Sequence, residues 1–279
     1  MCETLDRGIF WRRECVTGRG ILLDKCVQLQ RDVAGSLPKP SPCTTCSELR
    51  AAGHLEDGVY TISVYNGTTL LEMPALCDMT NGGLTYIQQR VDGEVSFERG
   101  WEEYKRGFGE VKADGSHWLG LENIHLLGAF CGLTAARIDI ADCQNATANV
   151  IYPVFTVSSE EEKYTLRQCG GHGSALDGIS EDPYGPQYVD WTQGLPFSTY
   201  DRDQDAWPDG NCARNFYGGW WYFWCAHSNL NNRYYDGCPS GALVGGDVPY
   251  ISGINWLPWR LHQVLAYAAI KLQPPPSVP

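Results

Sequence analysis

The stretch Trp118-Leu119-Gly120-Leu121-Glu122-Asn123-Ile124-His125 is the most informative part of this 279-residue sequence. Residues 121–127 are predicted to form a helix, and Trp101, Tyr104 and Phe108 share one face of a second, shorter helix upstream. Hydrophobic residues make up 43% of the chain and charged residues 19%, which is typical of a globular protein with a sizeable core. The sequence therefore predicts a folded domain with aromatic residues packed around this stretch.

Strand patterns lie on both sides of this helical stretch. Val59 to Val64 is rich in β-branched residues, and Asn66-Gly67 after it is a strong hairpin turn. A capping box at Thr45 and Glu48 predicts a short helix that Gly53 can end. Further strands are expected at residues 84–88, 136–140, 151–157, 164–167 and 264–272. Between about residue 170 and residue 264, Gly, Pro, Asn and aromatic residues dominate and regular periodicity fades, so we expect loops there.

Several ordered segments together resemble the fibrinogen-related domain of ficolins and tachylectins. They follow the family pattern from about residue 46 to residue 273: Cys77-Asp78-Met79, Gly82-Gly83-Leu84-Thr85, Gln89-Arg90-Val91-Asp92-Gly93, Phe97, Trp101, Tyr104, Gly107-Phe108-Gly109, residues 118–125, Phe197-Ser198-Thr199-Tyr200-Asp201, Asn211-Cys212-Ala213, Gly219-Trp220-Trp221, Asn229-Leu230-Asn231 and Gly253-Ile254-Asn255-Trp256. Each motif alone is weak, but so many in the same order make the resemblance specific.

The resemblance implies an α+β fold. It has a small N-terminal subdomain, a central antiparallel sheet with helices, and a loop-rich C-terminal subdomain that carries the binding functions. We expect this domain to span residues 43–273, with a flexible tail at 274–279. Residues 1–42 form an N-terminal extension that ends in the stiff segment Pro38-Lys39-Pro40-Ser41-Pro42. The extension is either a disulfide-linked segment that makes a homo-oligomer or a small subdomain folded back on the main body.

The cysteines and the charge indicate where the protein works. Twelve cysteines dispersed along the chain are typical of a disulfide-bonded, secreted protein, and the sequons at Asn66 and Asn145 fit N-glycosylation there. A zinc site at Cys43 and Cys46 is the weaker interpretation, because no second pair lies at finger spacing. The net charge of −12 disfavours nucleic acid and anionic membranes as partners. No stretch reaches the roughly 18 apolar residues of a membrane span, and no signal peptide is visible at the start.

The resemblance also implies disulfide pairs. In the family, the positions of Cys46 and Cys77 pair with each other, as do those of Cys212 and Cys225. The family does not place the remaining eight cysteines. Four of them depart from its pattern and are expected to form two extra disulfides in one of three connectivities: Cys131, Cys143, Cys169 and Cys238.

The segment Asp201 to Asn211 is the sharpest chemical signal. Alternate Asp residues on a tight loop can direct several hard oxygens at one Ca²⁺ ion, although a solvated acidic turn would have the same residues. An EF-hand is excluded, because loop positions 6 and 12 hold Ala206 and Cys212. The resemblance implies a structural calcium ion bound by four residues, the first two through carboxylates and the others through backbone carbonyls: Asp203, Asp205, Trp207 and Asp209.

The resemblance further implies a ligand pocket next to this loop. In ficolin-like relatives an acetyl group lies in an aromatic funnel beside the second cysteine of the late disulfide. Here the corresponding residues are Phe216, Trp224, Cys225, Ala226, Tyr250 and Ile251. Two of them depart from the family, since His usually follows the cysteine and a small residue or an Asp usually replaces Ile251. Most other aromatic residues of this region, including Trp220, Trp221 and Trp256, are expected in the core.

Two functions remain open at this point. The first is a calcium-dependent lectin of innate defence that binds acetylated or related glycans. The second is a secreted signalling or adhesion ligand that binds a protein receptor, which Ala226 and Ile251 favour. An enzyme is disfavoured, because the six His form no metal pattern and residues 171–175 lack nucleophile-elbow spacing.

Overall fold

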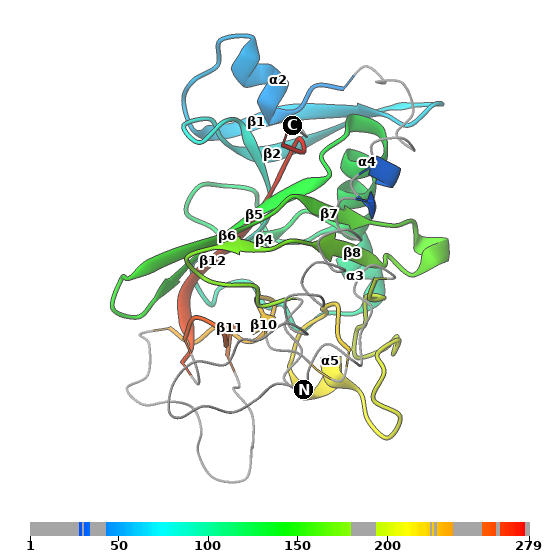
Figure 1. The fold of residues 1–279 in the computed structure, drawn as a ribbon, viewed down its shortest axis with the longest axis vertical. Coiled ribbons are helices and arrows are strands. Elements are labelled where there is room, and N and C mark those ends of the chain that lie inside the picture. The colour runs from blue at the N-terminus through cyan, green and yellow to red at the C-terminus, as the bar shows by residue number, and fades with distance from the viewer. Residues whose placement is uncertain are drawn as a thin grey trace, which may run out of the picture.

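The computed structural model describes residues 28, 29, 31–33, 43–179, 194–223, 225, 228–236, 253–260 and 263–276. Its described part is a mixed helix-and-strand fold with a central antiparallel sheet, few helices and a loop-rich C-terminal region. Figure 1 shows a small helix-and-hairpin unit at one end, long strands across the middle, and loops with short elements at the other end. None of the described helices is long and apolar enough to cross a membrane.

The N-terminal unit consists of α2 (Cys46–Ala51) and the hairpin of β1 (Gly58–Tyr65) and β2 (Leu70–Asp78). The predicted capping box is confirmed, since the Thr45 side chain accepts the Glu48 N–H and the Glu48 carboxylate accepts the Thr45 N–H at 2.7 Å. The predicted turn at Asn66-Gly67 is also confirmed, with Gly67 at a φ of +92°.

The central sheet has eight strands in the order β1-β2-β3-β12-β5-β6-β9, with β4 paired to β3. The strands that have not yet been given bounds are β3 (Leu84–Arg90), β4 (His117–Trp118), β5 (Ala135–Asp142), β6 (Thr147–Tyr152), β9 (His172–Gly173) and β12 (Leu265–Gln273). All pairs are antiparallel, and the C-terminal strand β12 lies between β3 and β5 in the middle of the sheet. The sheet therefore joins residues from both ends of the domain.

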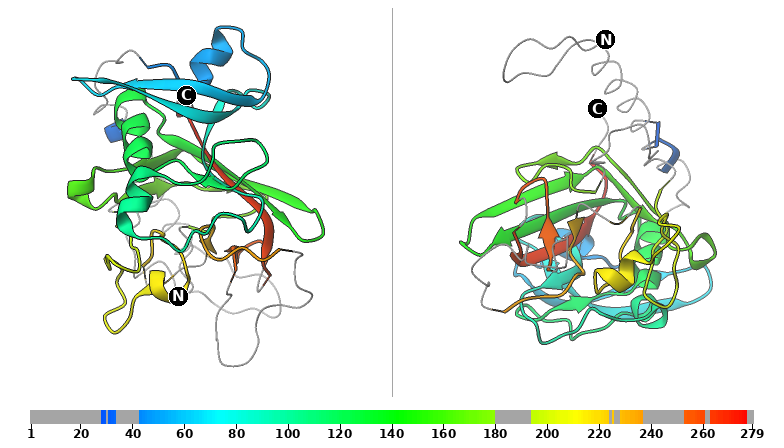
Figure 2. Two further views of the ribbon diagram at one scale, coloured as in Figure 1. Left: turned by 180° about the vertical axis from the view of Figure 1, so that it is seen from behind. Right: turned by 90° about the horizontal axis from the view of Figure 1, so that it is seen from below.

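Two helices lie beside the sheet: α3 (Trp101–Arg106) and α4 (Leu121–Cys131). Figure 2 shows both of them on the same side of the long strands. Trp101 and Tyr104 are buried as predicted, but the prediction that Phe108 belongs to the same helix is wrong. The helix ends at Arg106, because Gly107 has a φ of +94°, and Phe108 instead forms a bridge with Trp118 of β4.

The strand expected at residues 151–157 is two strands. Tyr152 ends β6, and after Pro153 the chain continues as β7 (Val154–Val157), which pairs with β8 (Leu166–Cys169) in a separate sheet. Proline has no N–H for a ladder hydrogen bond, so the strand breaks at Pro153. A 3₁₀ turn at Glu160–Glu162 joins β7 to β8.

In the described residues of the loop-rich C-terminal region the elements are short: α5 (Cys212–Asn215), β10 (Ser228–Asn229) and β11 (Asn255–Trp256). Aromatic side chains connect it to the sheet and helices. Trp221 lies with ring centroids 5.2 Å from Phe197 and 6.1 Å from Trp118. The expectation that Trp220, Trp221 and Trp256 belong to the core is confirmed, because each is at most 2% exposed.

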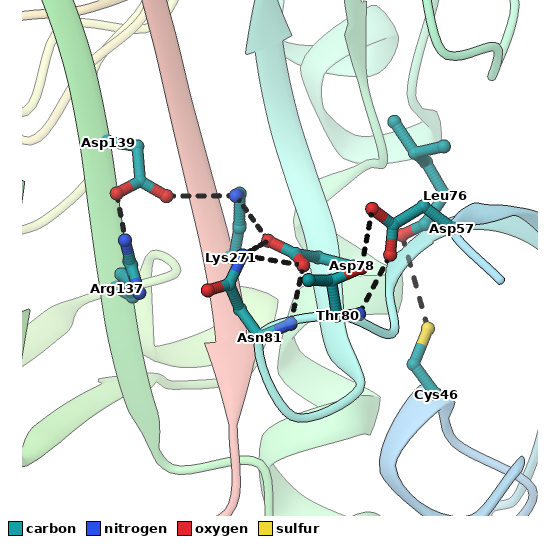
Figure 3. A network of polar contacts seen from close by, with 9 residues as sticks. All are labelled: Cys46, Asp57, Leu76, Asp78, Thr80, Asn81, Arg137, Asp139 and Lys271. Atoms are coloured by element: carbon teal, nitrogen blue, oxygen red, sulfur yellow. Dashed lines mark hydrogen bonds and ion pairs between the residues drawn. The ribbon is translucent and has the colours of Figure 1, made fainter. Parts of the chain in front are cut away.

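A buried charge network holds the middle of the sheet together (Figure 3). The Lys271 ammonium on β12 donates to Asp78 of β2 at 2.7 Å and to Asp139 of β5 at 2.8 Å. Arg137 donates to the other oxygen of Asp139 at 2.8 Å, and Asn81 donates to Asp78. Because the lysine is only 6% exposed, its two carboxylate partners are what make its burial tolerable.

Three disulfides are described: Cys43–Cys131, Cys46–Cys77 and Cys212–Cys225. The last two are the pairs that the family resemblance implies. The expectation that Cys131, Cys143, Cys169 and Cys238 form two disulfides among themselves is wrong, because Cys131 pairs with Cys43. That bond ties the first described residue of the main body to the end of α4. Cys143 and Cys169 are also disulfide-bonded, and Cys238 lies outside the described residues.

Only a few residues of the N-terminal extension are described. Residues 28, 29 and 31–33 are helical, and Leu29 and Val33 pack against Val154 of β7 and Cys169 of β8. This short segment therefore lies on the main body. The predictions for residues 1–27 and 34–42 fall outside the described residues.

Candidate functional site

The loop that carries the predicted calcium ligands begins next to the central core. Ser198 pairs with Trp220 in a β-bridge, and Thr199 pairs with Arg202, so the chain turns sharply at Tyr200 and Asp201. Gln204 then holds the chain that leaves this turn. Its side-chain amide donates to the Phe197 carbonyl at 2.6 Å, and its N–H donates to the Ser198 hydroxyl at 2.8 Å. Hydrogen bonds between the two ends of the loop therefore hold it in place without a ligand.

A second set of contacts ties the start of the loop to α3. The Asp201 carboxylate accepts the N–H of Trp101, the first residue of that helix, at 3.0 Å and the Thr199 hydroxyl at 2.7 Å. This carboxylate satisfies one of the free N–H groups at the helix start. Arg202 stacks on the Trp101 ring at 3.9 Å and pairs with Glu160 at 3.3 Å. Asp201 is thus a structural residue of the loop.

Asp203 and Asp205 form a close carboxylate pair. The Asp205 N–H donates to the Asp203 carboxylate at 3.3 Å. Among the described residues, neither carboxylate lies within ion-pair distance of a Lys, Arg or His side chain. Burial raises the pKa of Asp205, and the Asp203 charge adds to this, although backbone N–H groups of Cys212 and Trp207 oppose the change. A cation beside the pair would relieve this repulsion.

Asp205 also connects the loop to the late disulfide. One of its carboxylate oxygens accepts the Trp207 N–H at 2.9 Å, and the other accepts the N–H of Cys212, the first residue of α5, at 2.8 Å. Cys212 is bonded to Cys225, and the Ala206 N–H donates to the Phe223 carbonyl at 2.9 Å. The loop, α5 and the disulfide therefore form one connected unit.

The residues present fit a calcium ion of the kind that the family resemblance implies. The donors are hard oxygens, and each carboxylate oxygen of Asp205 keeps one lone pair after its single N–H bond. No three His, Cys, Asp or Glu side chains gather as a metal-ligand cluster in the described part of the chain, so an ion bound here would need backbone carbonyls as further ligands. The Trp207 carbonyl makes only a long contact, 3.4 Å, with the Gly210 N–H, and Asp209 is exposed at the tip of the loop.

Of the six predicted ligand-contact residues, the structure describes Phe216 and Cys225. Phe216 is half-buried at the end of α5, and Cys225 is bonded to Cys212 at its start, so both lie against the same short helix. Cys225 has a φ of +64°, which is a strained conformation for a residue with a side chain. Trp224, Ala226, Tyr250 and Ile251 lie outside the described residues.

Buried amides beneath this region were not identified from the sequence as supporting residues. Asn231 is fully buried; its side-chain amide donates to the Gly219 carbonyl at 2.9 Å, and its oxygen accepts the Gln88 amide at 3.1 Å. Arg90 of β3 donates to the carbonyls of Leu230 and Asn232 at 2.9 and 2.6 Å. The Asn229-Leu230-Asn231 motif could have predicted these supporting residues, because amide side chains that are buried in a loop region need hydrogen-bond partners.

The two predicted glycosylation sites lie in turns on the surface. Asn66 is half-buried in the β1–β2 turn, where its side-chain oxygen accepts the Thr68 hydroxyl at 2.8 Å. Asn145 is exposed in the β5–β6 turn with a φ of 62°. Glycosylation at both positions stays a prediction.

Comparisons with known proteins agree with this architecture. The family model described as fibrinogen beta and gamma chains, C-terminal globular domain, matches residues 43–275. Microfibril-associated glycoprotein 4 of Mus musculus is 40% identical over 223 residues, which cover 77% of each chain.

Two solved structures are similar in fold and in sequence. The fibrinogen-like globe domain of human ANGPTL2 has a TM-score of 0.72 and 35% identity, covering 84% of this chain and all of that one. A lamprey fibrin D-dimer, solved with the peptide ligand Gly-His-Arg-Pro-amide, has a TM-score of 0.73 and 28% identity, covering 95% of this chain and 88% of that one.

Proposed function

The chain belongs to the family of fibrinogen C-terminal globular domains, and from this premise we propose that it is a secreted, calcium-dependent lectin that binds acetylated or related glycans. The observation that carries the proposal is the Asp203–Asp205 pair, two adjacent carboxylates with no basic partner among the described residues. They lie in a loop that is hydrogen-bonded to the Cys212–Cys225 unit. The three described disulfides are consistent with an extracellular location.

The metal in this proposal is structural. Asp203 and Asp205 would bind Ca²⁺ through carboxylates, and Trp207 and Asp209 through carbonyls. The ion would neutralise the carboxylate pair and hold the loop in place. The chain's own residues would do the positioning: Asp205 fixes the start of α5, which carries the bond to the strained Cys225 at its first residue and ends at Phe216. An acetyl group would bind there, next to aromatic side chains and backbone N–H groups.

Clustering of several binding sites would raise the overall affinity of such a lectin. A single small-sugar site binds weakly, and several linked sites raise the overall affinity by roughly 100-fold or more. We propose that the N-terminal extension joins copies of the chain into a homo-oligomer for use in innate defence.

The experiment is a glycan and acetylated-ligand array with calcium and with chelator. It compares the wild type, the double variant Asp203→Ala with Asp205→Ala, and the matched control Asp114→Ala, which removes an exposed carboxylate elsewhere on the chain. Binding that requires calcium, is competed by N-acetylated sugars and is lost only in the double variant supports the proposal. Binding that is equal with and without chelator contradicts the calcium part of it.

A protein-binding function is the second candidate. The similar lamprey fibrin structure was solved with a peptide ligand, and the relative from Mus musculus is by its name associated with microfibrils. Ala226 and Ile251 replace the residues that the lectin relatives usually have. If no glycan binds under any condition while calcium still raises the thermal stability, a secreted signalling or adhesion ligand with a protein receptor becomes the better proposal.

A further inference from the structure

Two cysteines of the main body are disulfide-bonded to partners that the three described bonds do not include. Cys143 lies in the β5–β6 turn and Cys169 is the last residue of β8, and both are disulfide-bonded. The other cysteines among the described residues are already paired. The two are therefore bonded either to each other or to two of the four cysteines that lie outside the described residues: Cys2, Cys15, Cys26 and Cys238.

Cys143 and Cys169 are too far apart to bond to each other. Cys143 lies at the tip of the β5–β6 hairpin, directly after β5. Cys169 pairs with Val154, at the open end of that hairpin. The Phe155 N–H donates to the Thr134 carbonyl just before β5, which keeps β7 at the open end. The six residues of β6 separate the two ends by about 20 Å, at about 3.3 Å per residue, whereas bonded cysteines have Cα atoms about 4–7 Å apart.

The described part of the N-terminal extension lies against Cys169. Leu29 and Val33 are helical and pack on Val154 and Cys169, which are themselves buried (Figure 1, where this part is dark blue). Residues three or four positions apart share one face of a helix. One more helical turn before residue 28 therefore puts Cys26, three positions before Leu29, on the face that contacts Cys169.

A different segment lies beside Cys143. Its Sγ atom is 3.7 Å from the Val264 carbonyl oxygen. A Cβ atom on Gly253 would meet both Val264 and Tyr235, so these three residues come together near the hairpin tip. Cys238 follows Tyr235 by three positions, and three residues of chain reach about 10 Å at most. Cys238 is thus within reach of Cys143, at the opposite end of the hairpin from β8.

We propose that Cys26 is bonded to Cys169 and Cys238 to Cys143, so that residues 26–33 of the extension dock on β7 and β8 and are fastened there. In each bond two thiols lose two protons and two electrons to an oxidised dithiol carrier of the secretory pathway, by thiol–disulfide exchange. The docked face is the one that carries Leu29 and Val33, and these side chains are then used within the chain.

This connectivity decides how copies of the chain can be joined. The three described and two proposed bonds use ten of the twelve cysteines. Cys2 and Cys15 are then the cysteines that can bond to a second copy, and each chain leaves the main body at a fixed point beside β7. This last step rests on the proposed homo-oligomer, whereas the two intrachain bonds do not.

The test is peptide mapping of the full secreted chain by mass spectrometry, without and with reductant, after N-linked glycans are removed. Trypsin releases each cysteine of interest in its own peptide: 26–31 for Cys26, 138–163 for Cys143, 168–202 for Cys169 and 234–260 for Cys238. We expect peptide 26–31 linked to 168–202, and 138–163 linked to 234–260. Peptide 168–202 linked to residues 1–7, 14–19 or 234–260 would overturn the proposal.

Hydrogen exchange tests the docking itself. Leu29→Ala with Val33→Ala should accelerate exchange of the backbone amides of residues 28–33 by roughly tenfold, because the helix then loses its contacts with the main body. The matched control is Gln28→Ala with Asp32→Ala, which alters the exposed face of the same helix and should leave exchange nearly unchanged. Equal exchange in the two double variants would overturn the docking.

Electrophoresis without reductant separates this proposal from that of the oligomer. Covalent multimers of the wild type should become monomers in the double variant Cys2→Ser with Cys15→Ser. Multimers that persist in this variant would contradict the connectivity, because another cysteine would then join the copies. A monomeric wild type would reject the covalent homo-oligomer, while the mapped intrachain bonds would still support the docked extension.

Discussion

The sheet and the loop-rich end of this molecule are stabilised in different ways. In the sheet, backbone ladders pair β12 with both β3 and β5, and the buried side chains are largely aliphatic. In the loop-rich end, the described strands are only two residues long, and buried Asn side chains bind backbone groups. Regular structure satisfies its own backbone, whereas irregular structure must recruit side chains to do so.

The difference also shows which part depends on the other. Gln88 and Arg90 belong to β3, yet they donate to carbonyls of the loop at Leu230 and Asn232. In return, the described part of the loop-rich end gives the sheet a few single contacts, such as the Tyr234 hydroxyl that donates to the Ala266 carbonyl of β12 at 2.6 Å, whereas the sheet is held mainly by its own ladders. We therefore expect the loop-rich end to need the sheet, and the sheet to tolerate local damage in the loop.

Replacing the residue that joins the two regions should have the largest effect. Trp221→Ala removes a ring that packs against Trp118, Phe155 and Phe197, and it leaves the Tyr164 carbonyl without the indole N–H. We expect the free energy of unfolding to fall by about 5 kcal/mol in urea titrations. The control Tyr65→Ala, on the hairpin, should cost little. Loss of the loop alone, with an intact sheet, would contradict the connecting role of Trp221.

The second prediction breaks the charge network of the sheet. Lys271→Met leaves the buried Asp78 carboxylate without a cation and the half-buried Asp139 with Arg137 alone, at an expected cost of about 4 kcal/mol at neutral pH. The exposed pair at Lys112 provides the matched control, since Lys112→Met should cost less than about 1 kcal/mol.

The pH dependence sharpens this prediction. Although burial raises the pKa of Asp78, the hydrogen bond and charge of Lys271 hold it below its usual value. In the wild type this contribution is present above about pH 4 and is lost as the pH falls through the folded pKa. In the variant, burial is opposed only by the Asn81 hydrogen bonds, so the Asp78 carboxyl ionises less readily than in the wild type. The stability difference between the two proteins should therefore narrow on acidification, and a constant difference would show that lost packing explains the cost.

The third prediction concerns His117 in β4, which is 1% exposed and has no hydrogen-bond partner for either ring nitrogen in the described structure. Burial lowers the pKa of His117 to about 4, and the Gly115 backbone opposes this change. Between pH 6.5 and 4 the unfolded chain binds more protons than the folded chain, so stability should fall by roughly 3 kcal/mol as the pH drops. His117→Phe should remove this part of the slope in urea titrations at several pH values. If the variant keeps the same dependence of stability on pH, other titratable groups cause that dependence.

The smallest effect is expected in the loop-rich end. Asn231→Ala leaves the buried Gly219 carbonyl without its donor and should cost about 2 kcal/mol. Hydrogen exchange should accelerate for backbone amides near residues 216–232 while β5 and β12 stay protected. Gln144→Ala, at an exposed position of the β5–β6 turn, is the control. Equal acceleration in the sheet would show that the two regions unfold as one unit.

Local patterns predicted the regular elements well. The capping box at Thr45, the turn at Asn66 and the strands β1, β3, β5 and β12 are where the sequence places them. The mistakes have local physical causes, since Pro153 interrupts an apolar run and Gly107 ends a helix before Phe108. The Cys43–Cys131 bond joins residues 88 positions apart, and local sequence patterns do not predict pairing over such a separation.

The candidate site depended more on resemblance than on pattern. The residues alone left the acidic loop open between a calcium site and a solvated turn. The structure adds that the Asp201 carboxylate accepts the first N–H of α3, whereas Asp203 and Asp205 lie together as a pair. The contact of the extension with β7 and β8 could not be predicted, because Leu29 and Cys169 are far apart in the sequence and meet only in the folded chain.

The central position of β12 has a consequence for biosynthesis. Because the ribosome releases the chain from its N-terminus, β3 and β5 are made long before the strand that separates them. Until residues 265–273 emerge, both strands expose unpaired edges, and Asp78 and Asp139 have no lysine to neutralise them. A chain that stops before residue 265 therefore cannot complete the sheet, and we expect it to aggregate or be degraded.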